Sequence, residues 1–254
     1  MLKTIEKITV FSVERIWFQK SLIKVQSKSP VIRYMRVENI PEEKKNKANK
    51  ALTLWSDLTV DESELLIPMR KQVRYEIRRA LKEDIQVEVW DTNKQNVDFV
   101  LQEFHKVYNN FCLVSGYDEI IKDFNEKRIR SYADYGCVVI TIAKFQNGAV
   151  YHLYVHDERV ALLMYSASDF RNENVDNNLA GRANKLLHYK DMLLFKSMGV
   201  SIYDWGNVSS FDQQNGIDNF KVAFGGKQKV LYNVFVPNSM IGKILIALKE
   251  KVGK

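Results

Sequence analysis

Asp204 is the acidic residue whose position most clearly indicates a function. It ends a short apolar strand, expected over residues 202–205, where a carboxylate is unfavourable unless it has a partner or a task. Two roles fit this position. Asp204 either accepts a proton or orients the group that does, or it caps the backbone amides of the following loop.

Basic residues recur at four-residue intervals between residues 70 and 82: Arg70, Arg74, Arg78 and Lys82. On a helix this spacing places them on one face. Because guanidinium groups pair with phosphate oxygens, Arg74 and Arg78 are candidates for binding the phosphates of an acceptor, and Tyr75 beside them is a candidate for stacking on a base. The alternative is a solvated helix face that binds nothing.

The remaining reactive side chains show no catalytic or metal-binding spacing. The four histidines, at 105, 152, 156 and 188, lack ligand spacing, and His188 falls within an amphipathic helix, where a packed or half-exposed role is expected. Neither cysteine belongs to a metal motif or a disulfide framework. No Ser-His-Asp motif is present. We therefore expect no metal site and no covalent nucleophile.

Composition and charge restrict the class of protein. The chain has 254 residues, of which 46% are hydrophobic and 27% charged, which is typical of a globular protein that buries its own core. The N-terminal residues break any apolar run before it reaches signal-peptide length, and residues 240–248 are too few to span a membrane. We expect a soluble cytoplasmic protein. Its net charge of +7 favours polyanionic partners such as tRNA, a nucleotide or an anionic lipid surface.

The elements that must position these residues begin with a short leading segment. Residues 1–60 are expected to form a partial N-terminal subdomain with strands near 31–37 and 51–55 and a charged loop between them. A capping box at residues 59–62 predicts a helix that runs towards Lys82, kinked or divided at Pro68. Val73, Ile77 and Leu81 are expected to form its buried stripe.

The order of elements after residue 82 is more informative. Periodicity predicts a strand at 85–90, helices at 97–112 and 120–132, and a three-stranded meander at 137–145, 149–155 and 159–168. A polar loop at 169–180 leads to a helix at 179–198 that Gly199 ends. A strand at 202–205, a short helix at 217–221 and a strand at 230–236 follow. This order is that of an α/β protein with a mixed, largely antiparallel sheet and flanking helices.

This order resembles the GNAT acyltransferase fold, in which the sheet opens after the meander to admit an acyl donor. Three segments sharpen the resemblance to Fem-type aminoacyltransferases, which form peptidoglycan bridges. They are the basic helix at 69–82 before its strand, the helix and Tyr-Asp-Trp-Gly strand end at 184–206, and Phe-Lys-Val-Ala-Phe-Gly-Gly at 220–226. The resemblance covers residues 55–236 and implies one GNAT-like domain over 61–254 with a C-terminal helix, whereas Fem-type enzymes usually carry two such domains.

The resemblance also implies roles for individual residues. Lys221 matches the family's lysine at the mouth of the open sheet, where an ammonium stabilises the developing oxyanion or the leaving group. Asp204 is the second catalytic candidate, beside Trp205 as a residue for acceptor binding. The candidates for binding the acyl donor are Ser166 and Ser168 on the last meander strand, Gly181, Arg182 and Asn184 at the start of the long helix, and Phe220.

By resemblance, the chain is an acyltransferase of the bacterial cytoplasm. It would move an acyl or aminoacyl group from acyl-CoA or aminoacyl-tRNA, bound as a substrate and not as a tight cofactor, to an amine. The acceptor would be a nucleotide-linked or lipid-linked cell-envelope precursor: a peptidoglycan stem peptide or an amino sugar in polysaccharide biosynthesis. Contact with tRNA and peripheral contact with a membrane are compatible with this function. The alternatives are a coenzyme A-dependent N-acetyltransferase of a small amine and an inactive basic RNA-binding module.

Overall fold

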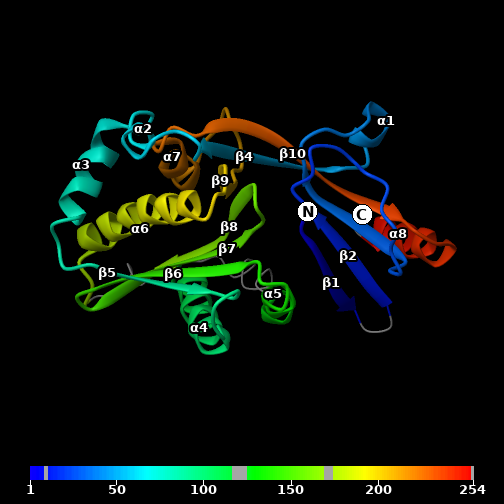
Figure 1. The fold of residues 1–254 in the computed structure, drawn as a ribbon, viewed down its shortest axis with the longest axis horizontal. Coiled ribbons are helices and arrows are strands. Elements are labelled where there is room, and N and C mark those ends of the chain that lie inside the picture. The colour runs from blue at the N-terminus through cyan, green and yellow to red at the C-terminus, as the bar shows by residue number, and fades with distance from the viewer. Residues whose placement is uncertain (9–10, 116–124, 169–173, 253–254) are drawn as a thin grey trace.

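The structure is a computed structural model that describes residues 1–8, 11–115, 125–168 and 174–252. Its strands form one sheet in the order β1-β2-β3-β10-β4-β9-β8-β7-β6-β5 (Figure 1). The strands are β1 (Lys3–Ile8), β2 (Phe11–Trp17), β3 (Val31–Val37), β4 (Asn49–Asp57), β5 (Gln86–Asp91), β6 (Val138–Phe145), β7 (Gly148–His156), β8 (Val160–Ser168), β9 (Ile202–Asn207) and β10 (Lys227–Pro237). Among them, only β2–β3 and β8–β9 pair in parallel. The expected α/β class and largely antiparallel sheet are confirmed.

Helices cover both faces of this sheet. They are α1 (Glu42–Lys45), α2 (Glu62–Leu65), α3 (Lys71–Ala80), α4 (Asp98–Ser115), α5 (Glu126–Ala133), α6 (Asn177–Ser197), α7 (Gly216–Val222) and α8 (Met240–Val252). Helix α6 lies on one face of the meander with α3 beyond it, whereas α4 and α5 lie on the other face (Figure 1). Helix α8 packs on β10 and β3. Among the described residues, none of these helices is both long and apolar enough to cross a bilayer.

The core is built from strands that are buried on both faces. Val138, Ile140 and Ile142 of β6 pack towards α4, whereas Val139 packs towards α6. Strands β6 and β7 therefore consist almost entirely of buried residues, whereas β8 is buried at its start and half-buried where it lines the cavity. The strands and helices predicted after residue 82 are all present where the structure describes them. Two predictions fall partly outside the described residues. The helix predicted at 120–132 overlaps the undescribed residues 116–124, and the loop predicted at 169–180 overlaps the undescribed residues 169–173.

The helix predicted from Thr59 to Lys82 is two helices. Helix α2 begins after Asp61, whose backbone amide donates to Glu64, so the predicted capping box is displaced by two residues. Thr59 instead bonds to the side chain of Asp57 in a turn. The predicted stripe is correct at Val73 and Ile77 but wrong at Leu81, which is 50% exposed because α3 ends at Ala80.

The segment before residue 60 belongs to the same sheet as the rest of the chain. The two predicted strands are present as β3 and β4, and the charged segment between them contains the short helix α1. Strands β1 and β2 were not predicted. Strand β10 lies between β3 and β4 and is antiparallel to both, so the last strand of the chain connects β1–β3 to the other strands.

Candidate active site

Strands β8 and β9 pair over only three residues each. Val160, Ala161 and Leu162 face Ile202, Tyr203 and Asp204, and the strands then separate although β8 continues to Ser168 and β9 to Asn207. A register shift against β7 adds Met164 to β8 directly after this point. Bulges of this kind bend a strand and increase its twist. The sheet therefore opens where the resemblance predicts.

Gly206 marks the point where the two strands begin to separate. Its φ is +72°, and a side chain would place its Cβ 2.5 Å from the carbonyl oxygen of Leu163. Only glycine accepts both this backbone conformation and this close approach without strain. The Tyr-Asp-Trp-Gly strand end therefore has a structural reason: its glycine lets β9 pass directly beside β8 before they diverge.

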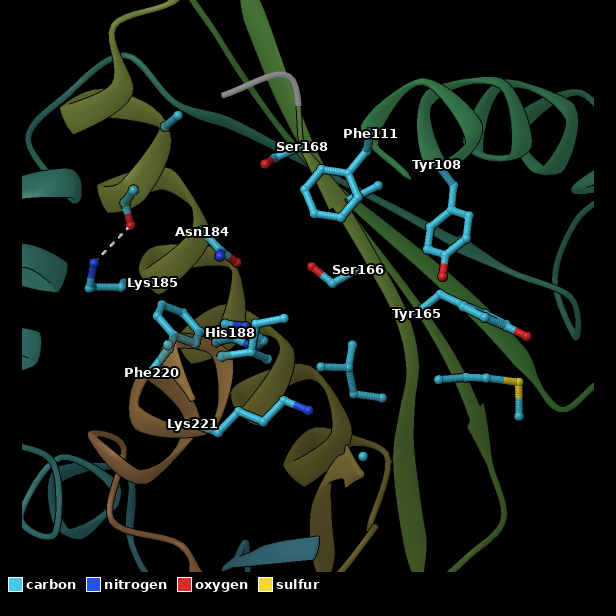
Figure 2. A pocket seen from close by; sticks show the side chains of 18 of the residues that line it. Tyr108, Phe111, Tyr165, Ser166, Ser168, Asn184, Lys185, His188, Phe220 and Lys221 are labelled. Carbon is cyan, nitrogen blue, oxygen red and sulfur yellow. Dashed lines mark hydrogen bonds between the residues drawn. The ribbon is translucent and has the colours of Figure 1, made fainter. Parts of the chain in front are cut away.

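A cavity of about 700 Å³ occupies the opening (Figure 2). It contains six of the predicted site residues: Ser166, Ser168, Gly181, Asn184, Phe220 and Lys221. Tyr108 and Phe111 of α4 lie across the cavity from α6 and α7 (Figure 2). The structure thus brings together the donor-binding candidates and Lys221, although they come from three elements.

Lys221 extends from α7 towards the cavity (Figure 2). Its Nζ donates a 2.7 Å hydrogen bond to the carbonyl oxygen of Asn207, on the strand that has left β8. Burial lowers the pKa of Lys221 to about 8, although Asp204 and Asp218 partly oppose the shift. The ammonium form still predominates at neutral pH and can donate hydrogen bonds to an oxyanion in the cavity.

Helix α6 presents one face to the cavity. Asn177, Gly181, Asn184 and His188 lie three or four residues apart and all line it. Arg182 falls on another face of the helix, where its guanidinium donates a hydrogen bond to Glu83 and forms an ion pair with it. The structure therefore places Arg182 outside this cavity, away from the other donor-binding candidates.

Asp204 is fully buried and does not line the cavity. Arg36 donates to both of its carboxylate oxygens, at 2.9 and 2.7 Å. Three further donors complete its shell: the Thr53 hydroxyl, the Trp55 indole and the backbone amide of Gly206. Because these donors surround it, the geometry favours a structural role over proton transfer, although side chains supply most of the donors and the Gly206 amide is the one backbone donor.

The other predicted acceptor-binding residues lie away from the cavity. Trp205 has no exposed surface and donates its indole hydrogen to Ser56, so it cannot contact an acceptor. Arg74, Tyr75 and Arg78 lie on α3, and none of them lines the cavity. Arg74 donates to the carbonyl oxygens of the loop before α3, which gives it a structural role.

A second cavity, of about 420 Å³, adjoins the first and is rich in arginine. The two cavities share residues of β8 and the pair Gly206 and Asn207. Four arginines line the second cavity: Arg15, Arg33, Arg36 and Arg128. Sequence reasoning missed this group, because its members lie on β2, β3 and α5 and meet only in the folded chain.

The arginine cavity holds uncompensated positive charge. Arg15 and Arg33 are direct neighbours in the parallel β2–β3 pair, and among the described residues Glu6 is the one carboxylate that pairs with Arg15 and Arg128. Burial and the charge of Arg15 lower the pKa of Arg33 to about 10. Arg15 Nη1 and Arg33 Nε are buried without a hydrogen-bond partner. Because four guanidinium groups line this cavity, it favours an anion with several oxygens.

A buried polar cluster lies behind the α6 wall. His152, His188 and Asp191 offer ligand atoms within 4.8 Å of one another, which is close enough for a metal ion. However, hydrogen bonds already occupy both ring nitrogens of His152, to Asp191 and Asn184, and Nδ1 of His188, to Tyr203. The donor set is therefore explained by hydrogen bonding.

No sequence-family model matches the chain, and no curated protein matches it by sequence. Solved structures do show a similar fold. FemX is 13% identical, with a TM-score of 0.60, over 97% of this chain and 85% of that one. L-PGS from Bacillus licheniformis is 11% identical, with a TM-score of 0.50, over 99% and 86%. The C-terminal domain of a protein assigned as a lysylphosphatidylglycerol synthetase from Agrobacterium fabrum is 10% identical, with a TM-score of 0.51, over 85% and 71%.

These identities show a shared fold and nothing finer. The similarity to FemX extends over almost the whole chain, which confirms at the level of fold the resemblance to Fem-type proteins. The ten-stranded sheet is larger than that of a simple GNAT domain, because β1–β3 and β10 extend it on one side.

Proposed function

We propose that this chain transfers an acyl or aminoacyl group from an activated donor to an amine of an anionic cell-envelope precursor. The observation that carries the proposal is the opening between β8 and β9, which Lys221 faces and which continues into the arginine cavity. The fold shared with FemX supports the same reaction class.

The residues of the cavity provide what aminolysis needs. The acceptor amine attacks the donor carbonyl and forms a C–N bond, and a tetrahedral oxyanion develops. Lys221 donates to this oxyanion, and Ser166 and Asn184 offer polar groups that position the donor. The intermediate then expels the donor's oxygen or sulfur, which takes up one proton, while the amine nitrogen loses one.

The arginine cavity supports an acceptor that carries phosphate. Arg15 and Arg33 line it together with Arg36 and Arg128, and guanidinium groups bind phosphate oxygens in pairs. Both nucleotide-linked and lipid-linked precursors contain a pyrophosphate. Because these arginines come from β2 and β3, the leading segment would contribute directly to acceptor binding.

The start of α6 favours an aminoacyl-tRNA donor over coenzyme A. A helix N-terminus can bind a pyrophosphate through free backbone amides. Here the Asp176 carboxylate already accepts hydrogen bonds from the amides of Asn178 and Leu179. Its negative charge would also repel a pyrophosphate at this position.

Helix α8 offers a surface for the expected peripheral contact with a membrane. Met240, Ile241, Ile244 and Leu248 leave more than half of their surface exposed. Lys243 lies among them, and basic residues beside an apolar helix face favour anionic lipid surfaces. Flotation with vesicles of anionic phospholipid tests this contact, and Ile244→Glu is expected to abolish it.

The proposed function is tested by incubating the purified chain with either labelled aminoacyl-tRNA or acetyl-coenzyme A and a nucleotide-linked peptidoglycan precursor or amino sugar. Label should move from the aminoacyl-tRNA to an amine of the precursor. Lys221→Met is expected to lower kcat by about 10²- to 10³-fold, as loss of an oxyanion donor does. Lys227→Met, on the exposed start of β10, is the matched control and should retain full activity.

The alternatives give different results. Transfer from acetyl-coenzyme A to a small amine, without need of the precursor, would identify an N-acetyltransferase. Binding of tRNA without transfer from either donor would identify an RNA-binding module. In that case Lys221→Met would bind tRNA as well as the unaltered chain does.

A further inference from the structure

A chain of buried hydrogen bonds leads from the cavity wall into the core. We call its four members, His188, Tyr203, Tyr154 and Asp191, the His188 relay. His188 Nδ1 lies 2.8 Å from the Tyr203 hydroxyl, which lies 2.7 Å from the Tyr154 hydroxyl. The Tyr154 hydroxyl lies 2.6 Å from Asp191 Oδ2. All four side chains are at most 2% exposed, so no bulk water competes for these bonds.

The direction of each hydrogen bond follows from the carboxylate. An ionised Asp191 only accepts, so Tyr154 donates its single hydroxyl hydrogen to it. Tyr203 must then donate to Tyr154, and its oxygen is left to accept from His188 Nδ1. Burial and nearby negative charge raise the pKa of both tyrosines well above their ordinary value, so both keep their hydrogens.

This sequence of bonds determines the tautomer of His188. Its Nδ1 carries the hydrogen, and its Nε2 is left with a lone pair. Burial and the neighbouring His152, Lys221 and Lys185 lower the pKa of His188 well below its usual range, so the ring is neutral. Nε2 has no partner among the described residues, and it is not among the fully buried orphan atoms, so it is open to the cavity that His188 lines (Figure 2).

The groups around the His188 ring leave this lone pair available. Trp205, Phe220 and Phe224 pack against the ring at 4.8, 5.5 and 5.4 Å between centroids; the two phenylalanines carry no donor, and the Trp205 indole donates to Ser56. Of its charged neighbours, Lys185 is held by Glu76 and Lys221 donates to Asn207. The inner end of the relay, in contrast, is unsaturated, because Asp191 Oδ1 is buried without a partner.

We propose that His188 accepts the proton of the attacking amine and that the relay carries a proton on to Asp191. The proposal rests on the transferase function proposed above. It gives His188 the role of a catalytic base, in direct reach of the reacting atoms, whereas Tyr203, Tyr154 and Asp191 act through it and never contact the substrate.

The transfer balances at every step. As the amine nitrogen bonds to the donor carbonyl carbon, its hydrogen moves to His188 Nε2. The Nδ1 hydrogen moves to Tyr203, the Tyr203 hydrogen to Tyr154, and the Tyr154 hydrogen to Asp191 Oδ2. Asp191 becomes a neutral carboxylic acid, which suits its buried position. When the C–O or C–S bond of the donor breaks, the proton returns by the same path to the leaving oxygen or sulfur.

The relay explains how a weakly basic histidine can serve as the base. A neutral imidazole surrounded by apolar rings and lysines gains a positive charge only at a cost. Because His188 releases one proton at Nδ1 as it gains another at Nε2, the charge does not remain on the ring.

Nuclear magnetic resonance of histidine-labelled protein tests the starting state without any substrate. Long-range ¹⁵N–¹H spectra at pH 7 should show His188 neutral, with hydrogen on Nδ1 and none on Nε2. A hydrogen on Nε2, or an imidazolium at pH 7, would overturn the proposal. Tyr203→Phe removes the acceptor of the Nδ1 hydrogen and should abolish the tautomer preference.

The catalytic role is tested with Tyr154→Phe, which interrupts the relay two residues away from the cavity. We expect kcat to fall by about 10²- to 10⁴-fold, the usual effect of losing acid–base catalysis, with KM unchanged. Tyr189→Phe is the matched control. Tyr189 lies on α6 and is buried like Tyr154, but its hydroxyl donates to Glu62, outside the relay. Equal kcat in the two variants would overturn the relay and leave the transferase function intact.

If Tyr154→Phe does not fold, a solvent isotope measurement on the unaltered protein still tests the relay. The rate of the unaltered enzyme in mixtures of H₂O and D₂O should depend non-linearly on the D₂O fraction, because several protons move together. A linear dependence would contradict the relay. Absence of transfer from every donor would instead overturn the proposed function, and with it the catalytic role of His188, even where the tautomer is as expected.

Discussion

Arg36 on β3 and Asp204 on β9 are joined by two hydrogen bonds across the intervening strands, although 168 residues separate them in the sequence. The pair lies beneath the point where the sheet opens, since Asp204 is the last residue of β9 that pairs with β8 in the sheet. This ion pair holds the β9 side of the opening in position.

Asp204→Asn should therefore destabilise the fold. The amide keeps the shape of the carboxylate but leaves Arg36 as a buried charge without its counter-ion, and removing one partner of such a pair costs about 3–5 kcal/mol. Urea denaturation measures the loss in free energy of unfolding. Asp212→Asn, at an exposed loop position, should change stability little. Loss of transfer without loss of stability would instead assign Asp204 a chemical role.

Transfer should decline as the pH rises through about 8. Lys221 stabilises the oxyanion only as an ammonium, and its pKa is lowered to about 8, so the active form is complete below that value and disappears above it. A pH profile of kcat measures this limb. The arginine in Lys221→Arg stays charged at alkaline pH. The decline of kcat above pH 8 should therefore disappear in this variant, even if its maximal kcat is lower. An unchanged limb would assign it to another group.

Pyrophosphate should bind in the arginine cavity. We expect it to raise the melting temperature of the unaltered chain and to bind Arg33→Gln at least roughly tenfold more weakly, the effect of one charged hydrogen bond. Without ligand, Arg33→Gln should be the more stable protein, because the variant relieves repulsion from Arg15. Arg78→Gln, on the exposed face of α3, is the control. If Arg78→Gln weakened binding instead, the ligand would lie on α3.

Gly225→Ala should destabilise the chain by about 1–3 kcal/mol or more. Gly225 has a φ of +79°, and a Cβ there would lie 2.2 Å from the carbonyl oxygen of Pro68. Gly216→Ala is the matched change at the start of α7, where nothing lies within 4 Å, and should be neutral or slightly stabilising. Thermal unfolding compares the two. Equal melting temperatures would show that the Phe-Gly-Gly segment does not need its glycine for conformation.

Hydrophobic periodicity in the sequence predicted the elements well where both faces, or one face, of a strand or helix are apolar. The meander and α6 are of this kind. Strand β2 was missed because Glu14 and Arg15 are buried within it, and their charges hide the pattern. Only the structure shows their partners on β1: Glu14 pairs with Lys3, and Arg15 with Glu6.

The candidate site was predicted in part for a similar reason. Gly181, Asn184 and Lys221 could be located because each lies in a segment with a local signature. The spacing of Asn184 and His188, four residues apart on one helix face, was also visible in the sequence and was the one available signal for His188. The link from His188 to Tyr154 and Tyr203 was not visible in the sequence. The three residues lie on three different elements, so their hydrogen bonds correspond to no local spacing.

The position of β10 between β3 and β4 has a consequence for biosynthesis. Until residues 227–237 have left the ribosome, β1–β3 have no strand through which to join the other strands. The arginines of β2 and β3 and the lysine of α7 then lie in two parts of the fold that no shared strand joins. A polypeptide still being translated, or one cut short before this strand, would carry every residue proposed above for catalysis and still lack the assembled enzyme.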